Sequence, residues 1–252
     1  MRFTSRTSSD GVTEQLFTLT SPCGTSASGE IPGALWTPDG AAGTRPLILM
    51  GHGGGQHKQA PGIVARARRF AADCGFAVAA VDAPGHGDRP RTGEHDRFIA
   101  EIRARVQARD NVTPVLASFH ALLAAQSVPE WRAVLDAVQQ LDHVGAGPAG
   151  YWGMSLGCAL GVPFIAAEPR IRAAVLGLNG AETSAEAAAQ ITVPVEFLLQ
   201  WDDALVPRAA ALALFDVLAS AKKTLHANPG GHGDVPAFEV DSTLRFFTRH
   251  LS

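Results

Sequence analysis

Short apolar runs alternate with longer amphipathic segments through most of the chain. Five of the runs consist mostly of apolar residues, as expected of strands that are covered on both faces of a sheet. Strands that alternate with helices in this way form parallel βαβ units with right-handed crossovers. The predicted strands of this type cover residues 46–50, 76–81, 148–151, 173–178 and 194–199, with a shorter candidate at residues 224–227. Predicted helices lie between or after them at residues 61–74, 158–167, 211–218 and 240–251.

The N-terminal part of the chain shows a different pattern. Residues 14–20 alternate between two faces and are interpreted as an edge strand, and residues 31–37 form a second strand candidate. Pro38-Asp39-Gly40 then supplies turn chemistry. Residues 21–29 are rich in turn formers and are expected to connect the two strands. The pattern therefore predicts an antiparallel N-terminal hairpin.

The stretch between the second and third buried strands is longer than one crossover needs. Apolar residues at helical spacing predict one helix around Ile99 and Val106 and a second around Val115 and Leu122. A sequence resembling a capping box at residues 127–130 predicts the start of a third helix. The first two helices are interpreted as an insertion, at about residues 89–127, in a single domain that spans residues 1–252. The insertion is a candidate cover for a functional site and a candidate oligomer surface.

Composition narrows the class of protein. The 252 residues are 46% apolar and 18% charged, which fits one large α/β domain with a substantial core. The net charge of −3 gives no electrostatic case for binding nucleic acid or an anionic membrane. The first ten residues are polar, and no apolar run is long enough to suggest a membrane span. Three cysteines without ligand-like spacing are typical of reduced thiols, so a cytoplasmic protein is expected.

Residues 153–157 read Gly-x-Ser-x-Gly and lie between a predicted strand and a predicted helix. A serine on such a sharp turn is the nucleophile elbow, and the turn is too tight for side chains at Gly153 and Gly157. The N-terminus of the following helix supplies partial positive charge where an oxyanion would form. Ser155 is therefore the candidate nucleophile. The motif alone also fits a glycine-rich strand end that carries an inert serine.

A serine nucleophile needs a base and an acid that orients the base. His232 follows two glycines between the last strand and the last helix, at the sheet edge where catalytic groups gather. Asp203 follows a buried strand and is the candidate acid. Asp202 is the alternative acid, although the spacing to the following Val-Pro favours Asp203. His226 is the alternative base, although it lies inside a predicted strand.

Five motifs follow one another along the chain: His-Gly-Gly-Gly at 52–55, Asp-Ala-Pro-Gly-His-Gly at 82–87, Gly-Met-Ser-Leu-Gly at 153–157, Asp203-x-x-Val206-Pro207, and Gly231-His232. Together they resemble the α/β-hydrolase superfamily, and most closely its compact esterase and dienelactone-hydrolase-like branch. The resemblance covers about residues 30–250 and implies a mostly parallel, twisted sheet flanked by helices. Dienelactone hydrolases are known for a cysteine nucleophile, whereas this chain has Ser155, which favours ordinary ester hydrolysis.

The same resemblance implies the oxyanion hole. One donor is the N–H group of Leu156, and the other is the N–H group of Gly54, with Gly53 as the alternative. His52, His57 and His86 have no acidic or cysteine partner at ligand spacing, so no metal site is predicted.

Several side chains beside the catalytic candidates are candidates for substrate binding. Met154, Trp201 and Leu205 are apolar and flank the predicted triad, so some of them are expected to line an acyl pocket. Arg89 begins the insertion and could hold a substrate carboxylate, or it could be a solvated surface residue.

The predicted function is hydrolysis of small to medium carboxylic esters through an acyl-enzyme intermediate, without a cofactor. A thioesterase, lactonase or amidase would use the same groups. A ligand-binding protein on a hydrolase scaffold is the alternative from a different class. The expected partner is a small-molecule ester, and a homo-oligomer is possible.

Overall fold

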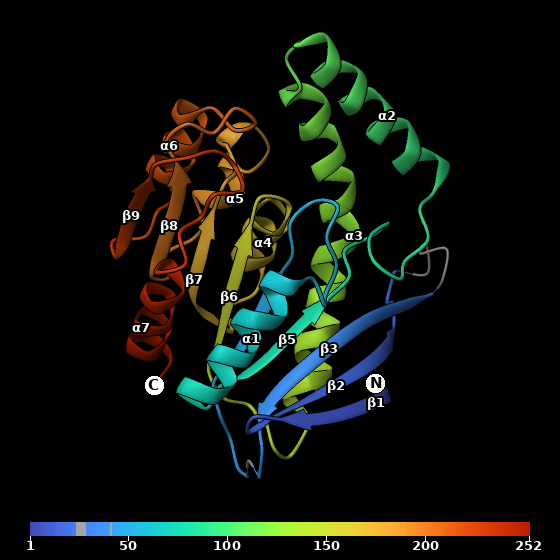
Figure 1. Ribbon diagram of the computed structural model, residues 1–252, viewed down its shortest axis with the longest axis vertical. Helices are drawn as coiled ribbons and strands as arrows, with labels where there is room; N and C mark the ends of the chain where they lie inside the picture. The colour runs from blue at the N-terminus through green and yellow to red at the C-terminus, as the bar shows by residue number, and fades with distance from the viewer. Residues whose placement is uncertain (24–28, 41) are drawn as a thin grey trace.

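The computed structural model describes residues 1–23, 29–40 and 42–252. In this part of the chain one nine-stranded sheet runs in the order β1-β2-β3-β5-β4-β6-β7-β8-β9 (Figure 1). The first three strands and the β3–β5 pair are antiparallel, and the remaining pairs are parallel, which confirms the predicted architecture. The strands are β1 (Arg2–Ser9), β2 (Val12–Thr20), β3 (Glu30–Pro38), β4 (Leu47–Gly51), β5 (Ala77–Val81), β6 (Ala149–Met154), β7 (Ile171–Gly177), β8 (Val195–Gln200) and β9 (Lys223–Asn228).

The N-terminal hairpin of β2 and β3 forms as predicted, but β2 is not the edge strand. β1 pairs with β2 in antiparallel fashion and lies outside it, with every residue exposed. The hydrophobic pattern missed β1 because its side chains are mostly polar on both faces, and a strand that buries no face shows no alternation. The predicted connector at 21–29 lies largely outside the described residues.

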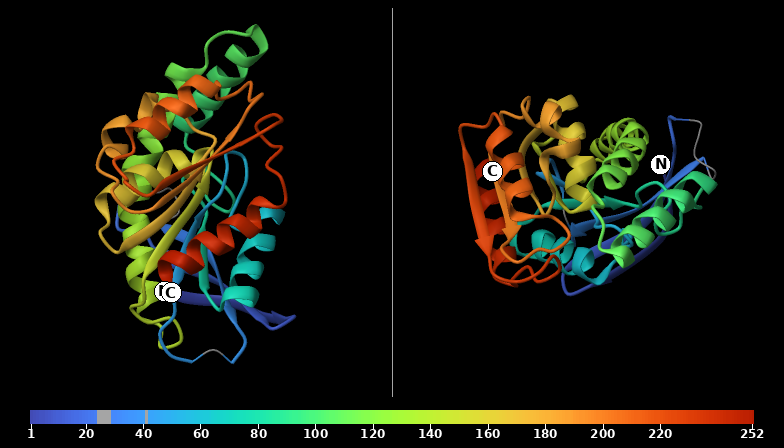
Figure 2. Two further views of the ribbon diagram at one scale, coloured as in Figure 1. Left: turned by 90° about the vertical axis from the view of Figure 1, so that its left-hand side faces the viewer. Right: turned by 90° about the horizontal axis from the view of Figure 1, so that it is seen from above.

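Helices cover both faces of the parallel part of the sheet (Figure 2). α1 and α7 pack on one face, and α3, α4 and α6 pack on the other. None of the helices in the described ranges is both long enough and apolar enough to cross a membrane. The helices are α1 (Pro61–Cys74), α2 (Gly93–Ala108), α3 (Thr113–Gln139), α4 (Leu156–Ala167), the 3-10 turn η1 (Ala181–Thr183), α5 (Ala185–Ala188), α6 (Arg208–Val217) and α7 (Glu239–Leu251).

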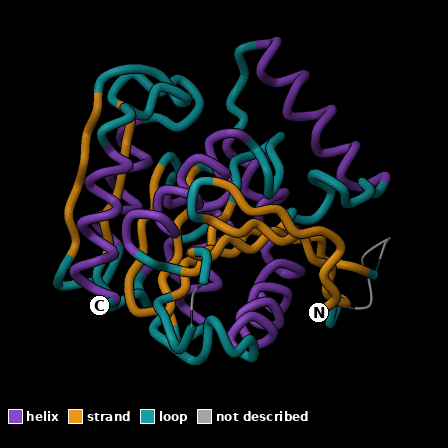
Figure 3. Tube along the Cα trace, turned by 60° about the horizontal axis from the view of Figure 1, so that its bottom comes forward, coloured by secondary structure: helices purple, strands orange, loops and turns teal. Residues whose placement is uncertain are grey.

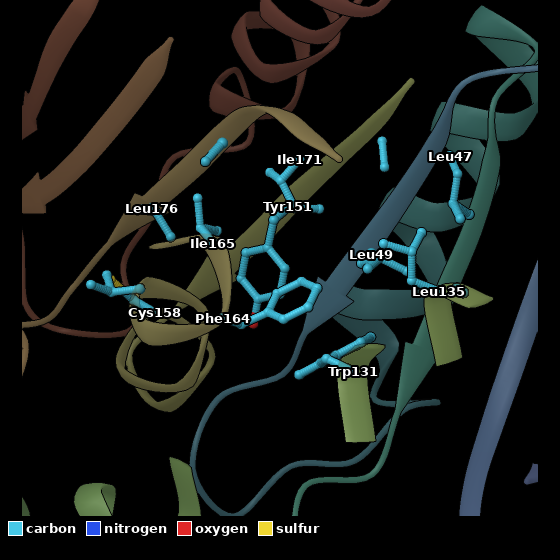
Figure 4. Packing of buried hydrophobic residues seen from close by; sticks show 14 of the residues in the cluster. Leu47, Leu49, Trp131, Leu135, Tyr151, Cys158, Phe164, Ile165, Ile171 and Leu176 are labelled. Atoms are coloured by element: carbon cyan, nitrogen blue, oxygen red, sulfur yellow. The ribbon is translucent and has the colours of Figure 1, made fainter. Parts of the chain in front are cut away.

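The core on the α3–α4 face includes Tyr151, which precedes Ser155 by four residues (Figure 4). Tyr151 of β6 packs edge-on against Trp131 of α3 and beside Phe164 of α4. Its buried hydroxyl donates to the carbonyl oxygen of Gly157, 2.8 Å away. The core therefore reaches the first turn of α4 by a specific hydrogen bond as well as by packing, which fixes the position of the strand-to-helix turn.

α3 is one continuous helix, so the predicted helix start at residues 127–130 is wrong. Pro129 lies inside the helix. In a capping box the Glu130 carboxylate would turn back to the Ser127 backbone. It instead accepts hydrogen bonds from the buried guanidinium of Arg89 at 2.7 and 2.8 Å. This long-range partner, which no local pattern reveals, keeps the carboxylate away from the backbone.

α2 and the first half of α3 form a helical hairpin that stands out from the body of the molecule (Figures 1 and 3). α2 buries only His95 fully, and it packs mainly against α3 through Phe98, which stacks on Phe119. The hairpin extends past the carboxyl ends of the parallel strands, beside the site described next.

Candidate active site

Ser155 sits on a strained turn between β6 and α4. Its φ and ψ of 56° and −119° place a non-glycine residue in a region that side chains disfavour. A Cβ at Gly157 would lie 2.3 Å from the carbonyl oxygen of Gly51, and one at Gly153 would lie 2.5 Å from that of Gly157. Only glycine allows these close backbone approaches. The local geometry is that of a nucleophile elbow, with the serine side chain lining a cavity.

Three side chains from three separate loops form one chain of hydrogen bonds. His232 Nε2 lies 2.9 Å from Ser155 Oγ, and His232 Nδ1 lies 2.6 Å from Asp203 Oδ2. The other carboxylate oxygen of Asp203 accepts from the N–H groups of Leu205 at 2.8 Å and Val206 at 2.9 Å. Because the carboxylate of Asp203 accepts a hydrogen bond from His232 Nδ1, the imidazole carries a proton on Nδ1. The lone pair of Nε2 then faces the serine hydroxyl.

The alternatives to the acid and the base lie elsewhere. Asp202 is exposed, and its carboxylate accepts from the N–H group of Gly230 at 3.1 Å. His226 lies on β9, where its Nδ1 is 2.8 Å from a carboxylate oxygen of Glu239. Neither residue is hydrogen-bonded to Ser155 or His232, so the structure brings together Ser155, Asp203 and His232.

The two predicted oxyanion donors both line the cavity that contains Ser155. Leu156 is the first residue of α4, so its N–H group precedes the first intrahelical hydrogen bonds. Gly54 lines the same cavity, whereas the N–H group of Gly53 faces the side-chain oxygen of Gln56 at 3.4 Å. This difference favours Gly54 over Gly53 as the second donor.

His52 holds the loop that carries Gly54. Its Nε2 accepts from the N–H group of Ala83 at 3.0 Å, so its Nδ1 carries the proton and donates to the carbonyl oxygen of Gly53 at 2.8 Å. Burial lowers the pKa of His52 to about 4, so the ring stays neutral near neutral pH. The tautomer depends on Ala83 in the loop after β5, a partner that the His-Gly-Gly-Gly motif at 52–55 does not contain.

A cavity of about 790 Å³ opens at Ser155. The helical hairpin of α2 and α3 forms one wall of it, and the loops after the parallel strands form the other. Apolar side chains line much of the interior, while Arg91, Arg103 and Glu182 lie on its lining as charged groups. The apolar lining consists of Ile99, Ile102, Leu116, Phe119, Leu156, Leu178, Leu205 and Val206.

Of the four candidate substrate contacts, Leu205 and Arg89 line the cavity, whereas Met154 and Trp201 do not. Met154 is buried in the core on the α1–α7 face, because alternate residues of β6 point to opposite faces. Trp201 is half-exposed, and the guanidinium of Arg208 stacks over its ring at 4.0 Å. Arg89 lies on the cavity lining, but its guanidinium is already paired with Glu130 and is not free to bind a substrate carboxylate.

Comparisons with known proteins place the chain among esterases by structure. No protein-family model and no curated protein sequence matches it. A cold-adapted esterase from an Arctic intertidal metagenomic library, in its PEG-bound form, is 32% identical with a TM-score of 0.81 and both chains covered completely. The same esterase in a zinc-bound form is 28% identical with a TM-score of 0.74, again with complete coverage of both chains.

More distant structures share the fold. Acetyl xylan esterase 1 from Thermoanaerobacterium sp. is 18% identical with a TM-score of 0.73, over 100% of this chain and 88% of that one. Dienelactone hydrolase from Anabaena variabilis is 18% identical with a TM-score of 0.64, over 95% and 99% of the two chains. Because the match to the Arctic esterase spans both chains at 32% identity, this protein belongs to the α/β-hydrolase superfamily, in its esterase and dienelactone-hydrolase-like branch.

Proposed function

We propose that this protein is a carboxylesterase with Ser155 as its nucleophile, His232 as its general base and acid, and Asp203 as the residue that orients the imidazole. The observation that carries the proposal is the continuous relay from Ser155 Oγ to His232 at 2.9 Å and from His232 to Asp203 at 2.6 Å. The relationship to an esterase at 32% identity over the whole chain supports ester hydrolysis.

The first half of the reaction forms an acyl-enzyme. Ser155 Oγ attacks the ester carbonyl carbon while its proton passes to His232 Nε2. The Asp203 carboxylate stabilises the imidazolium that results, since it already binds the Nδ1–H group. When the tetrahedral intermediate collapses, the bond to the alcohol oxygen breaks, and His232 returns the proton to the leaving alcohol. Ser155 is then esterified with the acyl group.

The second half uses water in place of the serine. His232 Nε2 removes a proton from a water molecule, which attacks the acyl carbonyl carbon. Collapse of the second tetrahedral intermediate breaks the bond to Ser155 Oγ, which recovers its proton from His232. In both halves the N–H groups of Gly54 and Leu156 stabilise the oxyanion, and the partial positive charge at the start of α4 adds to their effect.

The cavity indicates substrates of medium size. A volume of about 790 Å³ exceeds what an acetyl group needs and lies within the range of pockets for drug-sized ligands. Its apolar wall comes from Ile99 and Ile102 of α2 and from Leu116 and Phe119 of α3. We therefore propose that an aliphatic or aromatic part of the ester lies against the helical hairpin.

Hydrolysis of p-nitrophenyl esters from acetate to decanoate, by the wild type and by Ser155→Ala, tests the proposal. The wild type should hydrolyse the series with a preferred acyl chain length that is set by the size of the cavity. Ser155→Ala should lose at least about 10⁴-fold in kcat/KM. A fluorophosphonate should label the wild type at Ser155, as seen by peptide mass spectrometry, and should leave the variant unlabelled. Activity of Ser155→Ala equal to that of the wild type would show that the nucleophile is assigned wrongly.

A further inference from the structure

Three metal-ligating side chains meet outside the active site, between the sheet and the start of α7. Glu196 comes from β8, His226 from β9 and Glu239 from the first turn of α7. Each can offer one ligand atom, and these atoms all lie within 4.8 Å of one another. Figure 1 shows α7 beginning beside these two strands, far from α2 and the cavity wall that it forms.

Both carboxylates of the cluster are buried. The side chains of Glu196 and Glu239 are each only 4% exposed, whereas the side chain of His226 is 27% exposed. His226 therefore connects the buried pair to solvent, and an ion could reach the carboxylates along its ring.

The existing hydrogen bonds orient the cluster without balancing its charge. Glu196 accepts from the hydroxyls of Ser242 and Thr243 at 3.1 Å each. Glu239 accepts from the side-chain amide of Asn228 at 2.8 Å, and its other oxygen lies 2.8 Å from His226 Nδ1. Hydroxyl and amide donors are neutral, so none of them offsets a carboxylate charge.

Within the described ranges, neither carboxylate forms an ion pair with a lysine or arginine, and His226 is the only cationic partner of either. One imidazolium cannot balance two ionised carboxylates, and a neutral imidazole balances neither. Buried charges are ordinarily paired or coordinate a metal ion. The cluster therefore lacks at least one positive charge unless a carboxylate takes up a proton.

We propose that Glu196, His226 and Glu239 bind one divalent transition-metal ion of the zinc type. One ring nitrogen of His226 and one carboxylate oxygen of each glutamate all lie within 4.8 Å of one another. Ligand atoms around tetrahedral zinc, with bonds of about 2.0–2.2 Å, lie about 3.3–3.6 Å apart, so the three side chains would move closer together to bind the ion. A mixed imidazole and carboxylate set suits zinc, whereas magnesium and calcium prefer oxygen ligands alone.

An ion at this site would cross-link β8 and β9, the two strands that precede the proposed acid and base. β8 leads into the turn with Asp203, and β9 ends at Asn228, four residues before His232. Asn228 is tied both to the Glu239 carboxylate and, through its carbonyl oxygen, to the N–H group of Trp201 at 2.7 Å. The ion would thus be structural, and the ester chemistry at Ser155 does not require it.

The test uses tag-free, chelator-treated protein titrated with Zn²⁺ by calorimetry and thermal unfolding. The wild type should bind one Zn²⁺ per chain, and free zinc at about 100 times Kd should raise Tm by about 5–10 °C. Mg²⁺ or Ca²⁺ at the same concentration should leave Tm unchanged. His226→Gln, a substitution at a partly exposed position, should raise Kd by at least about 100-fold. His143→Gln changes a histidine outside the cluster and should bind as the wild type does.

Two results would overturn the proposal. One is a wild type that binds no Zn²⁺, which would mean that a proton on Glu196 balances the cluster instead. The other is unchanged affinity in both His226→Gln and Glu239→Gln, which would place the ion elsewhere, for example at the half-buried Cys23 or Cys74. Zinc-free Tm values of the variants separate loss of a ligand from loss of the fold. The outcome is independent of esterase activity, because the readouts are stoichiometry and Tm.

Discussion

His52 Nδ1 donates a hydrogen bond to the carbonyl oxygen of Gly53, 2.8 Å away. The same peptide group carries the N–H of Gly54, and in a planar trans peptide the N–H points opposite to the carbonyl oxygen. The N–H group of Gln56 donates to the same oxygen at 3.1 Å. His52 and Gln56 thereby hold the Gly53 carbonyl on one side and direct the N–H group of Gly54 to the other.

His52→Ala should therefore lower kcat by about 10–100-fold, somewhat less than deletion of an oxyanion donor, while KM changes little. His52 does not line the cavity, so it is a positioning residue. Steady-state kinetics on the best p-nitrophenyl ester would measure kcat and KM separately, and Tm would report any loss of fold. A kcat within about two-fold of the wild type would show that His52 does not orient the N–H group of Gly54.

Asp203→Asn should lower kcat by about 10⁴-fold with the fold intact. An amide at this position can donate to Nδ1 of His232, which would move the imidazole proton to Nε2 and remove the lone pair that faces Ser155. Asp202→Asn is the matched control, since the carboxylate of Asp202 accepts from the loop N–H group of Gly230, and this variant should retain most of the activity. If Asp202→Asn lost more of its kcat than Asp203→Asn, Asp202 would be the acid.

Gly157→Ala should destabilise the protein by at least about 2 kcal/mol, because its Cβ would meet the carbonyl oxygen of Gly51 at 2.3 Å. Gly93→Ala is the control within the same chain. Gly93 begins α2 with no atom within 4 Å of an added Cβ, so the substitution should be neutral or should stabilise by up to about 1 kcal/mol. Urea unfolding of both variants would measure the difference.

Phe119→Ala should move the preferred acyl chain to a longer one. Phe119 lines the cavity from α3 and stacks on Phe98 of α2, so its removal lengthens the apolar space and loosens the wall. The ratio of kcat/KM for decanoate over butyrate should rise by at least about five-fold, equivalent to about 1 kcal/mol. An unchanged ratio, in a variant of normal Tm, would mean that the substrate does not reach the hairpin.

His120 should contribute to the loss of stability in acid. Burial lowers its pKa from 6.5 to about 4, so the folded state holds it neutral where the unfolded chain would take up a proton. The free energy of unfolding that the neutral His120 side chain contributes is fully present above about pH 6.5 and is lost as the pH falls toward about 4. His120→Gln should therefore show a shallower fall in the free energy of unfolding between about pH 6.5 and 4.5 than the wild type, measured by urea unfolding. Parallel curves for the two proteins would contradict this.

The order of strands and helices was predictable because buried strands and amphipathic helices leave a period in the sequence. Residues 61–74 were predicted as a helix with the bounds that α1 has, and the left-handed Gly75 ends it as expected. The strand-to-helix turn at Ser155 was readable because two glycines are needed for its close backbone approaches. β1 left no such signal, since it buries no side chain.

The sequence by itself determined the α/β architecture, the elbow and the loops that could hold a base and an acid. Only the tertiary structure decided which groups meet, since Asp202 and Asp203 differ by one residue but point to different partners. It also pairs Arg89 with Glu130, 41 residues further along the chain, so that the guanidinium is not available to bind a substrate carboxylate. Periodicity records which face of an element is buried, whereas contacts between distant residues depend on how the elements pack, and no local pattern encodes that.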